Sequence, residues 1–178
     1  GAIGERPRSG AMVQVRVRAQ DRDELSITDG FNQGVHVLRL VGAGIAFEVV
    51  PGISSAYAVP AYAGIPVTQR GSAAQVTFVT GHEDPAKPGS DLDWGSLAAT
   101  PGTLVFLMGV GALAANAERL IEHGMSPDTP AAVISNGTRP AQRTVVAPLS
   151  GIAAAAEGMR PPAITLVGAV AALHEQLA

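Results

Sequence analysis

The chain has 178 residues, of which 47% are hydrophobic and 15% are charged, a composition that excludes an intrinsically disordered chain and fits one domain or two small ones. Its formal net charge of −3 gives no reason to expect nucleic acid or an anionic membrane as a partner. Cysteine is absent, so disulfides and thiolate metal sites are excluded, which is compatible with a cytoplasmic location.

The first part of the chain predicts one strand and one helix. Apolar and polar residues alternate over residues 13–18, which is the period of a strand. Residues 19–32 are charged and rich in turn formers, and we expect them to form a loop. A helix is predicted over residues 34–43, ended by the glycines of Gly42-Ala43-Gly44. No basic segment followed by an apolar stretch opens the chain, so we expect no signal peptide.

The next segment predicts a strand, a sharp turn and a helix. Residues 47–50 are aromatic, acidic and β-branched and predict a buried strand, which Pro51-Gly52 ends. Ser54 or Ser55 is expected to cap a helix over residues 56–63. The free N–H groups at such a helix start suit a carboxylate or a phosphate. An ordinary connection between a strand and a helix is the commoner explanation of this pattern.

Strands and helices alternate through the remaining residues, which indicates an α/β sheet. The expected strands cover residues 76–80, 104–108, 131–135, 143–147 and 164–167. The expected helices cover residues 111–124, 149–156 and 170–177. Between them, residues 82–93 are polar and contain proline and glycine, so they predict a loop. The longest apolar run, residues 104–115, is shorter than the roughly 20 residues that span a bilayer.

Separated blocks of this sequence resemble, in the same order, the tetrapyrrole methylases, which are S-adenosylmethionine-dependent C-methyltransferases. The most specific block reads IAFEVVPGISSA over residues 45–56. The others are residues 60–71 (PAYAGIPVTQRG), 76–83 (VTFVTGHE), 90–94 (SDLDW), 103–110 (TLVFLMGV), 137–145 and 161–168. The resemblance is good over about residues 34–178 and poor over residues 13–33.

The resemblance implies an α/β fold in two parts. These are a truncated N-terminal α/β domain over residues 1–66 and a C-terminal mixed-sheet α/β domain over residues 67–178. The closest group in the family methylates uroporphyrinogen III to precorrin-2, a step of cobalamin and sirohaem synthesis. The resemblance therefore implies S-adenosyl-L-methionine as the cofactor, a tetrapyrrole (uroporphyrinogen III) as the substrate and a cytoplasmic homodimer.

Four positions match cofactor contacts of the family. Ser54 and Ser55 follow the Pro-Gly-Ile turn, Met108 opens a Met-Gly pair after a buried strand, and Gly137 stands where the family brings backbone close to the adenosine. A flexible thioether packs well against a flat ring, and the absence of a Cβ permits close approach. From the residues alone, core packing for Met108 and an ordinary turn for Gly137 are the commoner explanations.

Arginines are the candidates for holding the substrate, because uroporphyrinogen carries eight carboxylates and Arg pairs with carboxylates in a bidentate manner. Arg70 is the first candidate, followed by Arg139 and Arg143. The alternative is that each is a solvated surface charge. The acidic residues and histidine between positions 82 and 93 fit no metal-ligand spacing, so no metal site is predicted.

The first half of the family's site has no match in this sequence. The expected glycine-rich loop and catalytic Asp are missing, and residues 15–22, where the family has a Gly-Gly-Asp clamp, contain no glycine. No catalytic residue is therefore assigned. Two hypotheses stay open: a C-methyltransferase completed by a partner chain or a dimer mate, and a catalytically inactive remnant or partner-binding domain of the same family.

Overall fold

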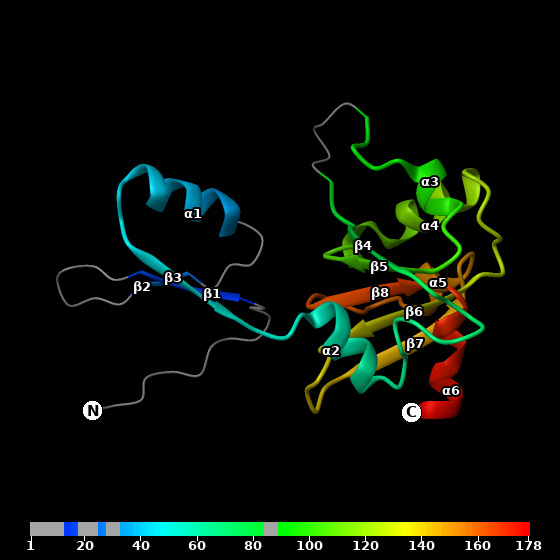
Figure 1. Cartoon of the computed structure of the whole chain (residues 1–178). Helices are drawn as coiled ribbons and strands as arrows, with labels where there is room; N and C mark the ends of the chain where they lie inside the picture. Colours follow the sequence, from blue (N-terminus) through cyan, green and yellow to red (C-terminus); the bar gives the residue numbers. More distant parts are fainter. Residues whose placement is uncertain (1–12, 18–24, 28–32, 84–88) are drawn as a thin grey trace. The chain divides into compact units, whose positions relative to one another are not determined.

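A computed structural model describes residues 13–17, 25–27, 33–83 and 89–178 of the chain. The chain forms two compact units, Gly1–Ser54 and Ser55–Ala178 (Figure 1). None of the described helices is both long and apolar enough to cross a membrane.

Within its described residues, the first unit contains a three-stranded sheet in the order β2-β1-β3 and one helix. Strands β1 (Val13–Val17) and β3 (Phe47–Pro51) and helix α1 (Gln33–Gly42) confirm the predicted elements. Strand β1 pairs antiparallel with both neighbours. The segment expected to be a loop contains a short strand, β2 (Leu25–Ile27), so that prediction is wrong there. Three residues are too few to show the period of a strand, and the rest of that segment lies outside the described residues.

The prediction that β3 is a buried strand is wrong. Val49 is 51% exposed, and α1 likewise exposes Leu38 (72%) and Val41 (59%). An apolar sequence favours packing of a strand against other elements, but it does not show whether another element covers that strand. Both hydrophobic cores found among the described residues lie in the second unit.

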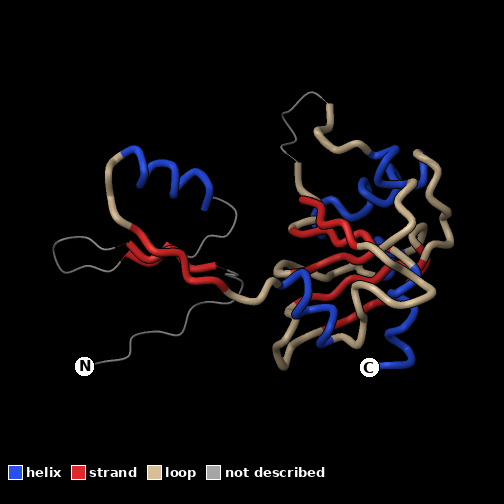
Figure 2. Tube along the Cα trace, viewed as in Figure 1, coloured by secondary structure: helices blue, strands red, loops and turns tan. Residues whose placement is uncertain are grey.

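The second unit is built on a five-stranded mixed sheet in the order β4-β5-β8-β6-β7. Figure 2 shows the strands of the chain in red. Its strands confirm the predicted ones: β4 (Val76–Thr80), β5 (Thr103–Leu107), β6 (Pro130–Ser135), β7 (Arg143–Pro148) and β8 (Ala163–Val167). Strands β4 and β5 are parallel, and every other pair is antiparallel. The continuous apolar run of β5 is explained by its interior position, which buries both of its faces.

Each face of this sheet carries its own core. Leu104 and Phe106 point to one face, which α3 (Trp94–Ala98), α4 (Leu113–Glu122) and α5 (Ile152–Ala155) cover. Val105 points to the other face, which α2 (Ser55–Tyr62) and the 3₁₀ helix η2 (Ala169–Leu173) cover. The alternation along β5 follows from the two-residue period of a strand.

The helices agree with the predictions except in four places, one of which is α5, observed over Ile152–Ala155 and predicted over residues 149–156. Helix α3 was not predicted, because its five residues are too few to show a helical period; the Asp93 side chain caps it by accepting from the Ser96 N–H. A 3₁₀ turn, η1 (Val110–Ala112), precedes α4 within the predicted helix 111–124. The predicted terminal helix is divided into η2 and α6 (His174–Leu177).

The division between the two units falls before α2. Ala56, Val59 and Ile65 are buried in the core that α2 shares with β5, β6 and β8, so this helix belongs to the second unit. The sequence-based domain boundary after residue 66 stays a prediction about separately folding domains.

Candidate functional site

The carboxyl ends of three strands meet at one edge of the second sheet. Strands β4 and β5 are parallel, and β8 runs antiparallel to both β5 and β6, so β4, β5 and β6 share a direction. The turns that follow them are residues 81–83, 108–109 and 136–138. Ligands of α/β proteins usually bind at the carboxyl ends of strands. This edge, called the carboxyl edge below, is the candidate site.

Backbone strain is concentrated at the carboxyl edge. Among the described residues, the non-glycine residues with positive φ are Met108 (59°), Asn136 (51°) and Thr138 (64°). Such a conformation costs about 1–3 kcal/mol per residue and is found most often at functional sites. All three strained residues lie in the turns after β5 and β6, which supports the choice of this edge.

Met108 is exposed at the surface and is not part of a hydrophobic core. Its side chain is 44% exposed, and it follows directly after the last residue of β5. The alternative explanation of Met108 as core packing is therefore wrong. An exposed thioether on a rigid turn is suited to pack against a flat ring.

Gly137 is in close contact with α2. A Cβ placed on Gly137 would lie 2.5 Å from both Cγ atoms of Val59, which is 8% exposed. Gly137 is not among the glycines with positive φ, so an ordinary left-handed turn does not explain it. The glycine is needed because Val59 occupies the side-chain space.

The beginning of α2 lies close to the Gly137 turn. Ser55 opens α2 and stands four residues before Val59, one helical turn of about 5.4 Å away on the same face. Both Ser54 and Ser55 are half-buried, and both have interaction partners. Ser54 is the last residue of the first unit, so only Ser55 is placed with Met108 and Gly137 in one unit.

The three candidate arginines are all exposed, and none makes an ion pair within the described part of the chain. Arg139 lies in the turn after β6, and Arg143 opens β7 opposite Ser135, so both belong to the carboxyl edge. Arg70 lies in an exposed turn before β4, within the Gln69–Ala73 bridge. No hydrogen bond or ion pair among the described residues ties Arg70 to the edge.

Sequence reasoning missed the residues that hold the turns of this edge together. The buried Asn116 on α4 donates from Nδ2 to the Gly81 carbonyl at 2.9 Å. A Cβ on Gly81 would lie 2.6 Å from the Cα of Gly109, so the turns after β4 and β5 touch. A single Asn in an amphipathic helix carries no sequence signal for this role.

The carboxylate of Glu83, in the turn after β4, is held by hydrogen-bond donors of the protein. The Glu83 carboxylate accepts hydrogen bonds from Ser90 Oγ (2.7 Å), the Asp91 N–H (2.8 Å) and Arg119 (3.1 Å). These bonds, those from Ser90 and Asp91 first, lower the pKa of Glu83. Among the described residues no group of three or more His, Asp or Glu side chains is arranged to hold a metal ion.

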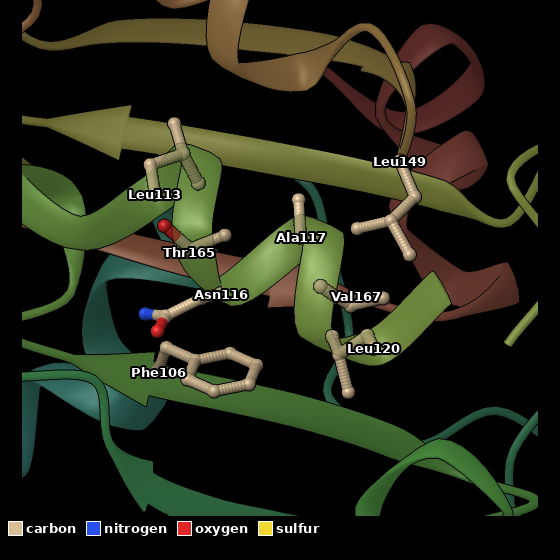
Figure 3. Close-up of a pocket in the computed structure, with 8 residues that line it drawn as sticks. All are labelled: Phe106, Leu113, Asn116, Ala117, Leu120, Leu149, Thr165 and Val167. Atoms are coloured by element: carbon tan, nitrogen blue, oxygen red, sulfur yellow. The ribbon is translucent and has the colours of Figure 1, made fainter. Parts of the chain in front are cut away.

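Two hollows of the second unit differ in size. One lies beneath α4, has a volume of about 10 Å³ and is lined by the side chains drawn in Figure 3, including Phe106, Leu120 and Thr165. It is a packing gap with room for no more than a water molecule. The other is an open groove of about 390 Å³ along β4 and α3. Neither is lined by Ser55, Met108 or Gly137.

Comparison with known proteins gives consistent matches. The sequence model of the Tetrapyrrole (Corrin/Porphyrin) Methylases matches residues 26–153. The chain is 59% identical over 140 residues to an S-adenosyl-L-methionine-dependent uroporphyrinogen III methyltransferase of Methanosarcina barkeri, covering 78% of this chain and 55% of that protein. It is 43% identical over 188 residues to a siroheme synthase of Neisseria meningitidis, covering 99% of this chain and 38% of that protein.

A comparison with a solved structure agrees with the sequence matches. The chain superposes on a uroporphyrin-III C-methyl transferase from Thermus thermophilus complexed with S-adenyl homocysteine, with a TM-score of 0.67 and 34% identity. That match covers 80% of this chain and 61% of the Thermus chain. The chain therefore spans 55% of the length of the Methanosarcina methyltransferase and 61% of the Thermus chain.

Proposed function

Because the chain belongs to the tetrapyrrole (corrin/porphyrin) methylase family, we propose that it acts in the C-methylation of uroporphyrinogen III by S-adenosyl-L-methionine. The product is precorrin-2, the precursor of cobalamin and sirohaem. The observation that carries this proposal is the 59% identity to the Methanosarcina methyltransferase. The span matched by the family contains Ser54, Ser55, Arg70, Met108 and Gly137.

The residues of the carboxyl edge suit the proposed cofactor. When bound, S-adenosyl-L-methionine supplies a methyl group on a sulfonium for in-line transfer. The exposed Met108 offers a thioether to the adenine, and the hydroxyl of Ser55 lies one helical turn from Val59, which contacts the Gly137 turn. Such a transfer requires positioning and exclusion of water more than acid–base chemistry.

Arginines are proposed to hold the substrate. Arg139 and Arg143 are exposed at the carboxyl edge and have no ion-pair partner in the described residues, so their guanidinium groups are available to carboxylates. Arg70 is proposed for the same role from its place in the family motif. No residue is assigned as the catalytic group.

A second candidate function is a catalytically inactive remnant or partner-binding domain of the same family. Residues 15–22, where the family has a glycine clamp, contain no glycine, and this favours the second candidate. The two candidates are separated by incubating the chain with methyl-labelled S-adenosyl-L-methionine and uroporphyrinogen III. Two labelled methyl groups per tetrapyrrole support the enzyme. Absence of incorporation contradicts the enzyme and favours the inactive remnant or partner-binding domain, whether or not the cofactor binds.

We further propose that the chain is a cytoplasmic homodimer, as the family resemblance implies. The first unit exposes Leu38, Val41, Val49 and Ile53, and an apolar surface of this kind indicates a covering partner. Light scattering on the purified chain is expected to give twice the chain mass of 18.0 kDa. A monomer mass at micromolar concentration would contradict the dimer.

A further inference from the structure

Four side chains form a closed ring of contacts next to the carboxyl edge. The Glu83 carboxylate accepts from Ser90 Oγ at 2.7 Å and from Arg119 Nη1 at 3.1 Å. The indole Nε1–H of Trp94 donates to the same Ser90 Oγ at 2.8 Å. The Arg119 guanidinium closes the ring, lying 5.4 Å from the centroid of the Trp94 ring in a cation–π arrangement.

The ring joins segments that are far apart in the sequence. Glu83 lies three residues after the end of β4, and Ser90 precedes α3. Trp94 is the first residue of α3, and Arg119 lies on α4. A second oxygen of the Glu83 carboxylate accepts from the Asp91 N–H at 2.8 Å. Glu83 is therefore the point on which the contacts converge.

The ring is anchored to the central sheet. Trp94 is 5% exposed and stacks on Phe106 of β5, with ring centroids 6.4 Å apart and planes at 12°. Phe106 stands two residues before Met108. The stacking of Trp94 on Phe106 thus connects the ring with the strand that precedes the strained Met108.

A separate set of contacts fixes the other end of the same turn. The Gly81 N–H donates to the Leu107 carbonyl at 2.7 Å, and the Gly81 carbonyl accepts from Asn116 at 2.9 Å. The backbone is consequently held at Gly81 by β5 and α4, and at Glu83 by the ring. Residues 81–83 are fixed from both sides at the carboxyl edge.

The ion pair of the ring contributes little to the stability of the fold. The Glu83 and Arg119 side chains are 22% and 44% exposed, and ion pairs at such exposure add little to stability. Hydrogen bonds from Ser90 and Asp91, with Arg119 nearby, lower the pKa of Glu83 and keep it ionised at neutral pH. The contacts of the ring fix the positions of its side chains, whereas its ion pair adds little to the stability of the fold. This combination indicates a positioning role.

We propose that this ring, whose contacts converge on Glu83, positions residues 81–83 for binding the tetrapyrrole at the carboxyl edge. The inference rests on the proposed function. The ring lies on the face covered by α3 and α4, whereas α2, with Ser55 and the contact to Gly137, lies on the opposite face. The ring and the contact between α2 and Gly137 therefore lie on opposite faces of the sheet.

The test compares two ligands on matched variants of the full chain. Glu83→Ala and Arg119→Ala break the ring, whereas Glu83→Gln keeps an acceptor for Ser90 and Asp91, and Arg119→Lys keeps the cation. Glu157→Gln is the control, because Glu157 is exposed and lies after α5. The probes are uroporphyrin III, the stable oxidised form of the substrate, and S-adenosylhomocysteine. Emission of the single tryptophan, Trp94, reports whether the ring is broken.

We expect Glu83→Ala and Arg119→Ala to weaken uroporphyrin III binding about tenfold, because residues 81–83 then lose the contacts that hold them in place before the ligand binds. The two conservative variants restore part of this loss, and the dissociation constant of S-adenosylhomocysteine stays within about twofold in all of them. A change in Trp94 emission accompanies the two alanine variants only.

Three results would overturn the inference. If Glu83→Ala binds uroporphyrin III as the unmodified chain does, the ring positions nothing and the proposed function is untouched. If both ligands weaken by the same factor, the ring supports the fold in general. If the unmodified chain binds neither ligand, the proposed function fails and the inference fails with it.

Discussion

Val59 of α2 fills the space that a side chain on Gly137 would need, since a Cβ there would lie 2.5 Å from both Cγ atoms of Val59. The family resemblance attributes this glycine to the close approach of the adenosine. The structure gives a second cause, because the direction of the missing Cβ is toward Val59 of α2. Glycine at this position lets the first turn after β6 pack directly against the helix that begins with Ser55.

This contact predicts a rescue. Gly137→Ala is expected to lower the free energy of unfolding by about 1–3 kcal/mol, as overpacking of a filled space does. Val59→Ala opens that space, so the double variant is expected to be more stable than the sum of the two single changes by about 1 kcal/mol or more. Urea denaturation measures both quantities. Gly111→Ala is the control, because nothing lies within 4 Å of its Cβ position, and strict additivity would contradict the account.

Strain at Met108 predicts an unusual order of stabilities. With φ at 59°, this residue is in the left-handed region, which costs non-glycine residues roughly 1–2 kcal/mol. Met108→Gly and Met108→Ala both remove the thioether, but only glycine relieves the strain. We expect the glycine variant to be more stable than the alanine variant by about 1 kcal/mol, measured by thermal unfolding. Alanine equal to or more stable than glycine would show that the turn carries no strain.

The hydrogen bond between Asn116 and Gly81 predicts a defined loss of stability. Asn116→Ala removes the donor to the Gly81 carbonyl and leaves a cavity beside two touching turns. A cost of about 1–3 kcal/mol is expected, because a buried carbonyl then lacks its partner. The exposed Glu118, on the other side of α4, provides the control variant Glu118→Ala. A cost no larger than that of the control would mean that the bond is not needed.

The lowered pKa of Glu83 predicts how the ring responds to acid. A carboxylate whose pKa is lower in the folded state than its usual 4.5 contributes stability above that value and loses it as the pH falls through the folded-state pKa. The ring is therefore expected to persist at neutral pH and to open below pH 4.5. Trp94 emission, followed from pH 7 downward, is expected to change with a midpoint below 4.5. The same change in Glu83→Gln, which has no carboxylate to protonate, would contradict this assignment.

The strands of the second sheet were predictable because interior strands such as β5 carry continuous apolar runs that have no other explanation. Short elements were not: β2 and α3 have too few residues to show a period, and α3 depends on the capping bond from Asp93. The burial of β3 was predicted wrongly, because a sequence states how apolar a strand is and not whether a partner covers it.

The site was predictable only as far as the family motifs reach. Met108, Gly137 and the start of α2 came from that resemblance, whereas the reason for Gly137 came from Val59, a residue of another element. The Glu83 ring could not be predicted either, because it too depends on contacts between different elements. Its members lie in segments that only the fold brings together, and Glu83, Ser90 and Arg119 each have the sequence context of an ordinary polar residue of a loop or helix surface.

The most direct test of the account is calorimetric titration of the purified chain with S-adenosylhomocysteine. The account predicts micromolar binding, about −8 kcal/mol, that weakens about tenfold or more in Met108→Ala. Met125→Ala is expected to bind like the unmodified chain, because Met125 is half-buried beyond the end of α4. Absence of binding heat at high protein concentration, or equal affinities in the two methionine variants, would contradict the carboxyl edge as the cofactor site.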